Sequence, residues 1–436
     1  MKKIVIAGAG HGGLTAAVNL AKKGFDVTII EAKQKDEMGH DWCDYLDMDA
    51  FDCSGIERPS KDMYDCGRQQ GYVNPSATMT IKTNLNEKSI IMDRKVLSAY
   101  LIDCAEKAGA KLVFGHKVLG AITEGSAVKG LRVLGDDGEY SIEADLVIDA
   151  AGMYSIVRTS LPESCGIQKL IEKEDVFHVY RAYFKNSEGT ITDPPYIVTL
   201  FHMNRPGIDW TLTEEDYVDI LVGKFGSEGE LTMDEVEAAI ADYRRQYPFI
   251  SDELVRGGSF ADIPLTKMIP MLVCDGYAAV GDSAGMTVPL NGCGIVLSMR
   301  AGKILADTVI NAYGPLTKKA LWPYQYEYFQ KLGHELVTID ILKNFFTCIK
   351  GSDVDYVLEK KVLSAKQLSF GDGQGLNITP EFVLRALSVA VPLRKVIPPL
   401  IMNMKGMPIK FISAKAMPKT YDEKKVSAWL KMYEVI

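Results

Sequence analysis

Residues 2–14 read KKIVIAGAGHGGL. A short β-branched run that ends in glycine is typical of a buried strand. Residues 12–24 then follow helical spacing and stop at Gly24, and residues 25–32, FDVTIIEA, form a second strand-like run. This order predicts a βαβ unit of about 30 residues at the start of the chain.

The glycines of this unit fit the GxGxxG pattern in the strand-to-helix context that binds dinucleotides. Gly8 allows the tight turn, Gly10 lets a pyrophosphate reach the backbone, and Gly13 lets the helix pack on the strand. The helix N-terminus offers N–H groups to the phosphates, and Glu31 ends the second strand, where an acid binds the adenosine ribose. The alternative is a glycine-rich turn that packs tightly without a ligand. The expected dinucleotide contacts are Gly8, Gly10, His11, Gly12, Gly13, Glu31 and Ala32.

Composition narrows the class of protein. The 436 residues predict two or three domains, since domains average about 150 residues. A hydrophobic content of 47% favours a globular fold, and a net charge of −8 argues against nucleic-acid binding, which usually needs a basic face. The eight cysteines form no CxxC pair, so we expect no metal site and a reducing, cytoplasmic setting. The apolar start is too short for a signal peptide, and no apolar run is long enough to span a membrane.

Hydropathy patterning divides the rest of the chain. Residues 36–92 break the βαβ rhythm and are interpreted as an insertion near the active site. Residues 175–225 alternate apolar and polar side chains, which predicts an antiparallel sheet, whereas 144–152 and 275–282 return to buried-strand patterns. The expected division is 1–165 and 257–315 for a dinucleotide-binding domain, 166–256 for an antiparallel-sheet substrate domain and 316–436 for a helical region.

A second motif lies far downstream: GYAAVGDSAG at 276–285, followed by PLNGCGI at 289–295. With it, the sequence resembles the flavoprotein family of geranylgeranyl reductases and, more loosely, aromatic hydroxylases of the p-hydroxybenzoate type. The resemblance also covers DRKVLSAYLIDCAEKAGA at 93–110, DLVIDAAGMYSIVR at 145–158 and PGIDW at 206–210. It implies bound FAD and an α/β fold: a Rossmann-like FAD-binding domain, an antiparallel-sheet substrate domain and a C-terminal helical region.

The resemblance also implies roles for single residues. Asp282 would bind the ribityl chain of the flavin, and Arg94 would reach the cofactor from the start of its helix. Val118 would flank the adenine, and Ala151 and Gly152 would line the dinucleotide. An N-cap for Asp282 and a surface salt bridge for Arg94 are the structural alternatives. Gly281 and Ile295 complete this set of expected cofactor contacts.

The glycines of PLNGCGI are expected to form a cradle for the flavin ring. A flavin that accepts two electrons gains negative charge near N1 and the C2 carbonyl, and N–H groups at a helix N-terminus stabilise such charge. Gly292 and Gly294 lack the side chains that would keep the backbone away from the flat ring. Pro289 would set the approach of the chain, and Asn291 is a candidate further donor. The alternative is a plain helix start with small residues for packing.

Three residues are candidate catalytic contacts: Cys43, Cys293 and Trp210. Cys43 lies in GHDWCD, residues 39–44, which loosely resembles the glycine- and cysteine-bearing loop near the flavin of geranylgeranyl reductases. The two thiols either act as a redox pair or are small buried hydrophobes, and Trp210 either stacks on a substrate or belongs to the core. Those reductases carry Phe-Pro where this chain has Leu212-Thr213, a departure that argues against an isoprenoid substrate.

Three functions are consistent with these features. The first is an FAD-dependent reductase that transfers hydride from reduced flavin to a carbon–carbon double bond of an apolar, isoprenoid-like or other unsaturated small molecule. The second is a flavin-dependent aromatic hydroxylase, and the third a redox sensor that uses Cys43 and Cys293. Because the chain has one GxGxxG motif, the electron donor is expected to be external, either a ferredoxin as redox partner protein or NAD(P)H.

Residues 390–417 are Met-rich and locally basic within an acidic chain. They form either an apolar lip that contacts lipid or a lipid-like substrate, or a helical cap packed on the body. The first interpretation would make the protein a peripheral membrane protein.

Overall fold

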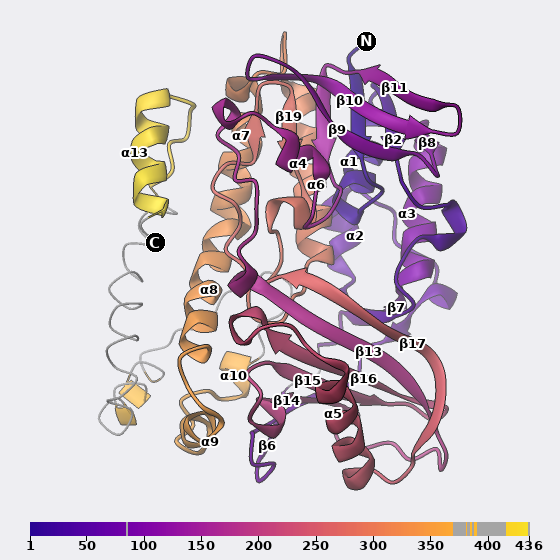
Figure 1. The fold of residues 1–436 in the computed structure, drawn as a ribbon, viewed down its shortest axis with the longest axis vertical. Coiled ribbons are helices and arrows are strands. Elements are labelled where there is room, and N and C mark those ends of the chain that lie inside the picture. Colours follow the sequence, from indigo (N-terminus) through magenta and orange to yellow (C-terminus); the bar gives the residue numbers. More distant parts are fainter. Residues whose placement is uncertain (84–85, 369–380, 382–383, 386–387, 390–415, 435–436) are drawn as a thin grey trace.

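The molecule was analysed as a computed structural model that describes residues 1–436 except 84–85, 369–380, 382–383, 386–387, 390–415 and 435–436. Figure 1 shows an elongated body with the N-terminal sheet at one end, a large antiparallel sheet at the other and helices along one side. Most of segment 390–417, for which the sequence leaves a lipid-contacting lip and a helical cap as alternatives, lies outside the described residues. No described helix is long and apolar enough to cross a membrane.

The N-terminal sheet confirms the predicted βαβ unit. Its six strands run in the order β18 (Val273–Cys274), β19 (Tyr277–Ala279), β12 (Leu146–Asp149), β1 (Lys3–Ala7), β2 (Asp26–Ile30) and β8 (Lys111–Val113). β1 pairs in parallel with both β2 and β12, and β12 pairs in parallel with β19. The carboxyl ends of β1, β12 and β19 therefore meet at one edge, where ligands of open α/β sheets bind.

The helices that cover this sheet pack very closely against one another. α1 (His11–Ala21) packs against α6 (Ile295–Asn311), and α3 (Arg94–Ala108) lies beside α1. A Cβ atom on Gly302 of α6 would lie 2.2 Å from the carbonyl oxygen of Gly12. The two helices can approach this closely only because both residues are glycine.

Two small antiparallel sheets complete this end of the molecule. The predicted hairpins are β9 (Lys117–Glu124), β10 (Ala127–Gly135) and β11 (Gly138–Glu143), which form a three-stranded sheet. The second sheet has the order β3 (Cys43–Asp47), β7 (Ser89–Asp93) and β4 (Asp65–Cys66). The short helices nearby are α2 (Asp49–Ser54), α4 (Ile156–Ser160), η1 (Lys35–Glu37), η2 (Lys61–Met63) and η3 (Glu163–Cys165).

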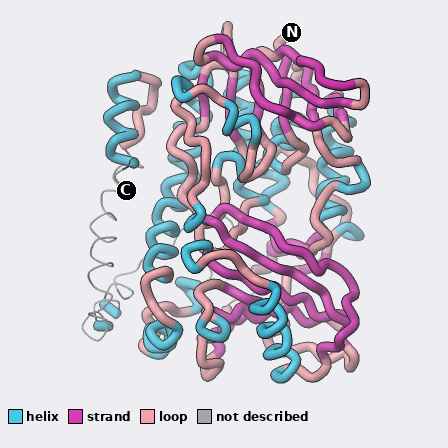
Figure 2. Tube along the Cα trace, viewed as in Figure 1, coloured by secondary structure: helices cyan, strands magenta, loops and turns pink. Residues whose placement is uncertain are grey.

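The large sheet has seven strands, seen edge to edge in the lower half of Figure 2. Their order is β17 (Ile250–Pro264), β13 (Val176–Asn186), β16 (Tyr217–Phe225), β15 (Ile208–Thr213), β14 (Tyr196–Leu200), β5 (Gln70–Val73) and β6 (Thr80–Lys82). Two of these strands come from the expected insertion, and β5 pairs in parallel with β14. The expected boundary at 256 falls inside β17, because this strand pairs with β13, with irregularities in register, as far as Pro264.

Strand alternation gives the large sheet two different faces. On one face, Ala182, Ile220 and their neighbours pack under α5 (Met233–Gln246) in a separate hydrophobic cluster. On the other face, Phe177, Leu221 and Phe225 line a cavity between this sheet and the loop that precedes α6. The short helices that adjoin this sheet are η4 (Lys173–Asp175), η5 (His202–Asn204) and η6 (Gly226–Glu228), whereas η7 (Gly281–Ala284) follows β19 and packs on α1 and α6.

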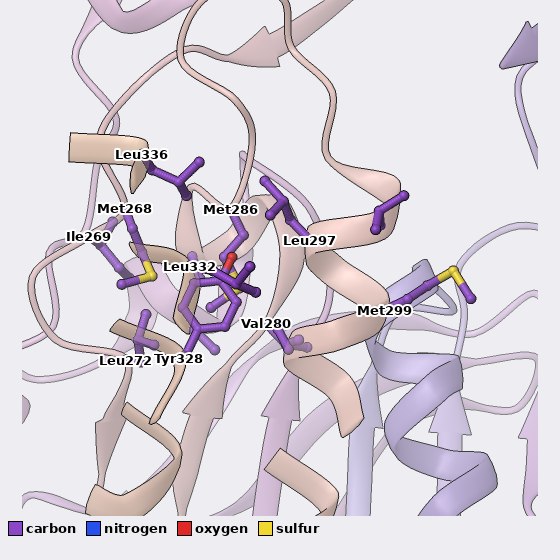
Figure 3. Close-up of a cluster of buried hydrophobic side chains, with 14 of the residues drawn as sticks. Met268, Ile269, Leu272, Val280, Met286, Leu297, Met299, Tyr328, Leu332 and Leu336 are labelled. Atoms are coloured by element: carbon purple, nitrogen blue, oxygen red, sulfur yellow. The ribbon is translucent and has the colours of Figure 1, made fainter. Parts of the chain in front are cut away.

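The described residues after 316 are mainly helical, as the sequence indicates. They form α7 (Lys318–Tyr328), the π-helical turn η8 (Phe329–Gly333), α8 (His334–Phe346), α9 (Gly351–Glu359), α10 (Ala365–Leu368) and α13 (Glu423–Glu434). Figure 3 shows how this region joins the core: Tyr328 and Leu332 pack with Val280, Met286 and Leu297. The helical region therefore supports the loop and helix that follow β19.

A buried histidine links the large sheet to α5. His202 Nδ1 lies 2.7 Å from Asp209 Oδ2, and its Nε2 lies 2.9 Å from Asp242 Oδ2. Carboxylate oxygens only accept hydrogen bonds, so both ring nitrogens carry hydrogen and the ring is charged. Burial opposes this charge, but the hydrogen bonds to Asp209 and Asp242 outweigh it and raise the pKa of His202. Arg205 pairs with Asp209 and Arg245 with Asp242, so each carboxylate also has a second cation.

We predict that His202→Gln lowers the free energy of unfolding by about 2 kcal/mol at pH 6, the usual effect of losing hydrogen bonds to charged groups. A raised histidine pKa gives stability that is complete below the unfolded value of about 6.5 and is lost as the pH rises through the folded value. The difference from wild type should therefore shrink between pH 6 and pH 9. Urea unfolding followed by circular dichroism measures it. A difference that stays constant over this range would contradict a charged His202, and His116→Gln, a change at a half-buried histidine without a carboxylate partner among the described residues, serves as the control.

Candidate active site

The glycine loop between β1 and α1 has the geometry of a dinucleotide cradle. Gly8 has a φ of +86°, and a Cβ atom there would lie 2.6 Å from the carbonyl oxygen of Ala150. A Cβ on Gly13 would lie 2.7 Å from the Ala150 side chain, so this glycine lets α1 pack on the sheet. Gly10 was expected to be small for a pyrophosphate, and the structure adds a second reason: a Cβ there would lie 2.9 Å from the Ala150 oxygen.

The expected adenosine contacts surround the same edge of the sheet. The Glu31 carboxylate accepts hydrogen bonds from the N–H of Ala9 at 2.8 Å and of Lys33 at 2.9 Å, so it also shapes the glycine loop. Val118 is buried in β9. Gly152 has a φ of +82°, and a Cβ there would meet nothing within 4 Å, so the chain is open to a ligand at this point. The roles of Glu31, Val118 and Gly152 in binding the dinucleotide remain proposals.

His11 provides a direct test of whether a cofactor fits. Its Nε2 atom is buried and has no hydrogen-bond partner among the residues that the structure describes. Burial, with a smaller effect of the Arg94 charge, lowers the pKa of His11 to about 4, so the ring is neutral at pH 7. A buried polar nitrogen without a partner is costly unless a ligand satisfies it. The position of His11 within the glycine loop makes the dinucleotide the ligand that fits.

Asp282 is also available to a ligand. It lies in η7, directly after β19, and within the described residues its carboxylate makes no hydrogen bond or ion pair. Burial raises the pKa of Asp282, and the nearby Arg94 opposes this rise. A carboxylate with free lone pairs at a strand end suits the hydroxyl groups of a ribityl chain.

In the loop that precedes α6, two structural constraints explain why glycine is required. Gly292 has a φ of +75°, which favours glycine whatever lies nearby. A Cβ on Gly294, the residue before α6, would lie 2.9 Å from the Thr287 side chain. The Asn291 side-chain oxygen accepts from the N–H of Cys293 at 3.1 Å, and its amide nitrogen stays the proposed further donor. These internal constraints produce the open backbone that we propose as the flavin cradle, with Pro289 and Ile295 at its two ends.

A cavity of about 330 Å³ lies between this loop and the large sheet. The structure brings the three candidate catalytic residues to it, since Cys43, Trp210 and Cys293 all line its wall. The lining of the apolar part includes Phe177, Val198, Leu200, Phe201, Ile208, Leu221, Phe225, Ile263, Leu290, Phe346, Leu363 and Leu368. The cavity therefore joins the proposed flavin cradle to an apolar chamber.

The sequence analysis missed a chain of buried charges in the cavity wall. Arg94 pairs with Asp44, Nη2 to Oδ1 at 2.7 Å, and so makes a partly buried salt bridge in the cavity wall rather than a surface one. Arg181 forms two hydrogen bonds to Asp219 at 2.9 and 2.5 Å, and its Nη1 lies 3.8 Å from Asp44. The guanidinium of Arg181 also lies over the ring of Trp210, 5.2 Å from its centroid. One feature of the sequence could have revealed this chain of charges: Arg181 is a charged residue in the largely apolar strand β13.

Cys43 has the environment of an unreactive thiol. Its backbone N–H donates to the Tyr183 hydroxyl at 2.7 Å, which fixes the start of β3 against the large sheet. Burial raises the pKa of Cys43 to about 11, and the Arg256 charge offsets only part of this rise. Since the thiolate is the reactive form, this environment favours a spacer over a nucleophile.

We predict that Cys43 resists alkylation in the native protein. With a pKa of about 11, only about one thiol in a thousand is ionised at pH 8. Iodoacetamide labelling followed by peptide mass spectrometry should modify Cys53, which is exposed on α2, at least about a hundredfold faster. Equal labelling of the two cysteines would instead reveal an activated thiolate at Cys43.

Comparison with known proteins places this geometry in a family. Residues 1–217 match the model of the FAD binding domain. The chain is 27% identical to digeranylgeranylglycerophospholipid reductase from Methanosarcina acetivorans, over 84% of this chain and 89% of the relative. The same enzyme from Sulfolobus acidocaldarius is 22% identical over 84% and 82% of the two chains. A geranylgeranyl bacteriochlorophyll reductase-like structure from Thermoplasma acidophilum superposes with a TM-score of 0.74 at 18% identity, over 91% of this chain and 99% of that one.

The fold and the cradle therefore define an FAD-binding flavoprotein with the architecture of the p-hydroxybenzoate hydroxylase-like enzymes. More narrowly, the chain belongs to the FAD-dependent oxidoreductases that are related, at a distance, to the geranylgeranyl reductases. Both the expected cofactor and the expected family are confirmed.

We predict that His11→Leu weakens FAD binding about fivefold, because a neutral hydrogen bond contributes about 1 kcal/mol. Titration of the deflavinated protein with FAD, followed by flavin fluorescence, measures the dissociation constant. His116→Leu is the matched control, since His116 is half-buried and its ring contacts Tyr140 of β11. An unchanged dissociation constant for His11→Leu would remove His11 from the cofactor site.

Proposed function

We propose that this protein reduces a carbon–carbon double bond of an apolar, unsaturated small molecule. The observation that carries this proposal is the apolar chamber that opens directly onto the loop Gly292–Gly294. The names of the relatives, digeranylgeranylglycerophospholipid reductases, support an unsaturated isoprenoid-like substrate.

FAD in its reduced form supplies a hydride for such a reaction. The chain itself binds and orients the substrate and excludes water from the site. The N–H groups at the start of α6 are placed to stabilise negative charge, and Gly294 leaves them uncovered. The apolar wall, with Leu200 and Phe225, keeps water from the reacting carbons and holds the double bond against the cradle.

Trp210 is the side chain that we propose to position the substrate. Its ring lines the cavity, and Arg181 and Tyr196 hold it, the latter edge to face at 6.0 Å between ring centroids. A ring fixed on two sides is a rigid surface for an alkene chain. Leu212, where the reductases carry phenylalanine, also lines the cavity, so the change there enlarges or reshapes the chamber without making it polar.

We predict that the reduced holoprotein, kept free of oxygen, is reoxidised by an isoprenoid alkene such as geranylgeraniol. Dithionite reduces the bound flavin first, and recovery of the flavin absorbance is then compared with saturated product measured by mass spectrometry. One double bond should disappear per flavin, with the second hydrogen supplied as a proton by solvent or a side chain. Trp210→Ala should slow the reoxidation about tenfold at unchanged FAD content, as expected for loss of an aromatic contact.

Two outcomes would overturn this function. A hydroxylated product that forms only when oxygen is admitted would identify a monooxygenase instead. Flavin that is reoxidised by none of the alkenes, but that changes state with the thiols of the protein, would favour a redox sensor.

A further inference from the structure

Two cysteines away from the cavity are in contact with each other. η3 ends at Cys165 and β18 ends at Cys274, and both residues are buried, with 1% and 2% of their surface exposed. A hydrogen bond joins the two thiols. Neither cysteine is part of the cavity wall. The pair therefore stands apart from the proposed active site.

Contacts with the turn between β9 and β10 hold the two cysteine-bearing segments together. The Cys165 thiol donates to the carbonyl oxygen of Ser126, with 3.2 Å between sulfur and oxygen. Two residues further on, the N–H of Val128 donates at 2.8 Å to the carbonyl oxygen of Asp275, which follows Cys274. One short stretch of chain is thus bonded to both segments.

Lys318, the first residue of α7, joins the same two segments from another side. Its Nζ donates to the carbonyl oxygen of Cys165 at 3.2 Å, and its backbone N–H donates to the Asp275 carboxylate at 2.6 Å. The contacts from α7 and from the β9–β10 turn are independent of each other. The proximity of Cys165 and Cys274 therefore does not depend on their own hydrogen bond alone.

The two thiols differ in acidity. The hydrogen bond from Cys274 lowers the pKa of Cys165, and the Lys318 ammonium acts in the same direction, whereas burial opposes both. The same hydrogen bond, together with burial, raises the pKa of Cys274. Peroxide-sensitive cysteines combine a thiol of lowered pKa, which attacks as the thiolate, with a neighbouring thiol that resolves the product. Cys165 has the properties of the attacking thiol and Cys274 those of the resolving one.

A small oxidant has a short route to Cys165. Its neighbours Ser164 and Gly166 are exposed, and so is Ser126 in the β9–β10 turn. η3 is a turn of three residues that ends at Gly166, which has a φ of +70°. Local opening of a short surface turn costs far less free energy than opening a sheet. A molecule the size of hydrogen peroxide can therefore reach this thiol while the sheets stay intact.

The position of the two cysteines in the chain gives a bond between them a structural consequence. The chain passes from the FAD-binding domain to the large sheet after Cys165, and it has returned to the N-terminal sheet at Cys274. The lobe between them, residues 176–264, contains β13 to β17 and α5. Its first and last strands, β13 and β17, pair side by side (Figure 1). A covalent bond between the cysteines would close the chain at the base of this lobe.

We propose that Cys165 and Cys274 are a redox modification site, at which peroxide forms a reversible disulfide that clasps the lobe 176–264 at its base. The Cys165 thiolate attacks one oxygen of hydrogen peroxide, the O–O bond breaks, and a sulfenic acid and hydroxide form. The Cys274 thiol then attacks the sulfenic sulfur, an S–S bond forms, and the oxygen leaves as water. The thiols lose two electrons and the peroxide gains them, and exchange with a small thiol reverses the reaction. This proposal does not rest on the reduction of alkenes.

Peptide mass spectrometry of the holoprotein tests the bond directly. Wild type is freed of reductant, treated with hydrogen peroxide, blocked at its remaining thiols and digested without reduction. A peptide that joins Cys165 to Cys274 should form, and dithiothreitol should remove it. The proposal is overturned if both cysteines remain thiols while exposed Cys53 is oxidised, or if Cys165 is joined to a different cysteine.

Single variants test the order of attack. Cys274→Ser keeps a hydrogen-bond donor but cannot form the bond, so dimedone should trap the sulfenic acid of Cys165. In Cys165→Ser, dimedone labelling of Cys274 should be at least about tenfold slower, because its thiol is the less ionised. Equal labelling would contradict these roles. Cys104→Ala is the matched control, since half-buried Cys104 contacts Tyr100 instead of a thiol, and it should form the Cys165–Cys274 bond as wild type does.

Thermal unfolding followed by circular dichroism tests the clasp. Oxidised wild type should unfold about 5 °C above the reduced protein, because a cross-link that closes a long loop restricts the unfolded chain. Cys104→Ala should show the same difference, and Cys274→Ser should show none. A disulfide that forms without raising the midpoint of unfolding would overturn the clasp.

Discussion

The buried ion pair between Arg181 and Asp219 is the constraint on which the geometry of the site depends. Burying two charges costs more solvation free energy than their attraction usually returns, so such a pair contributes orientation more than stability. Arg181 also reaches Asp44, which holds Arg94 at the start of α3. This chain of alternating charges runs from the large sheet to the FAD-binding domain. Loss of one member would leave its neighbour uncompensated, so the two domains keep a fixed relation across the cavity.

Contacts within the protein also determine the backbone shape of the cofactor site. Gly8, Gly13 and Gly292 each have a reason inside the protein, either a positive φ or a neighbour too close for a Cβ atom. The open backbone that a flavin needs is thus a product of how the chain itself packs. Preorganisation of this kind lets N–H groups act on developing charge without a cost of reorganisation.

The sequence was informative where a function requires a local pattern. The βαβ unit, the glycine loop and the strand before Asp282 follow from residues close together in the chain. The charged wall of the cavity did not follow, because Asp44, Arg181 and Asp219 come from three separate strands. The parallel pairing of β5 with β14 is equally non-local, and it moves residues 70–73 into a sheet more than a hundred positions away. Arg181, a charged residue in a largely apolar strand, was the one local feature that pointed to buried acidic partners.

Strand β14 shows how the outer face of the large sheet supports the inner one. Tyr196, Val198 and Leu200 line the cavity, whereas Thr199 points to the side where His202 lies. The chain turns sharply after this strand, with φ values of +52° at Phe201 and +55° at Met203, which are costly for residues other than glycine. His202 sits between these two residues and is fixed by Asp209 and Asp242. The strained turn persists because these hydrogen bonds hold it, and Phe201 thereby keeps its place in the cavity wall. A charged histidine outside the cavity therefore helps to define the shape inside it.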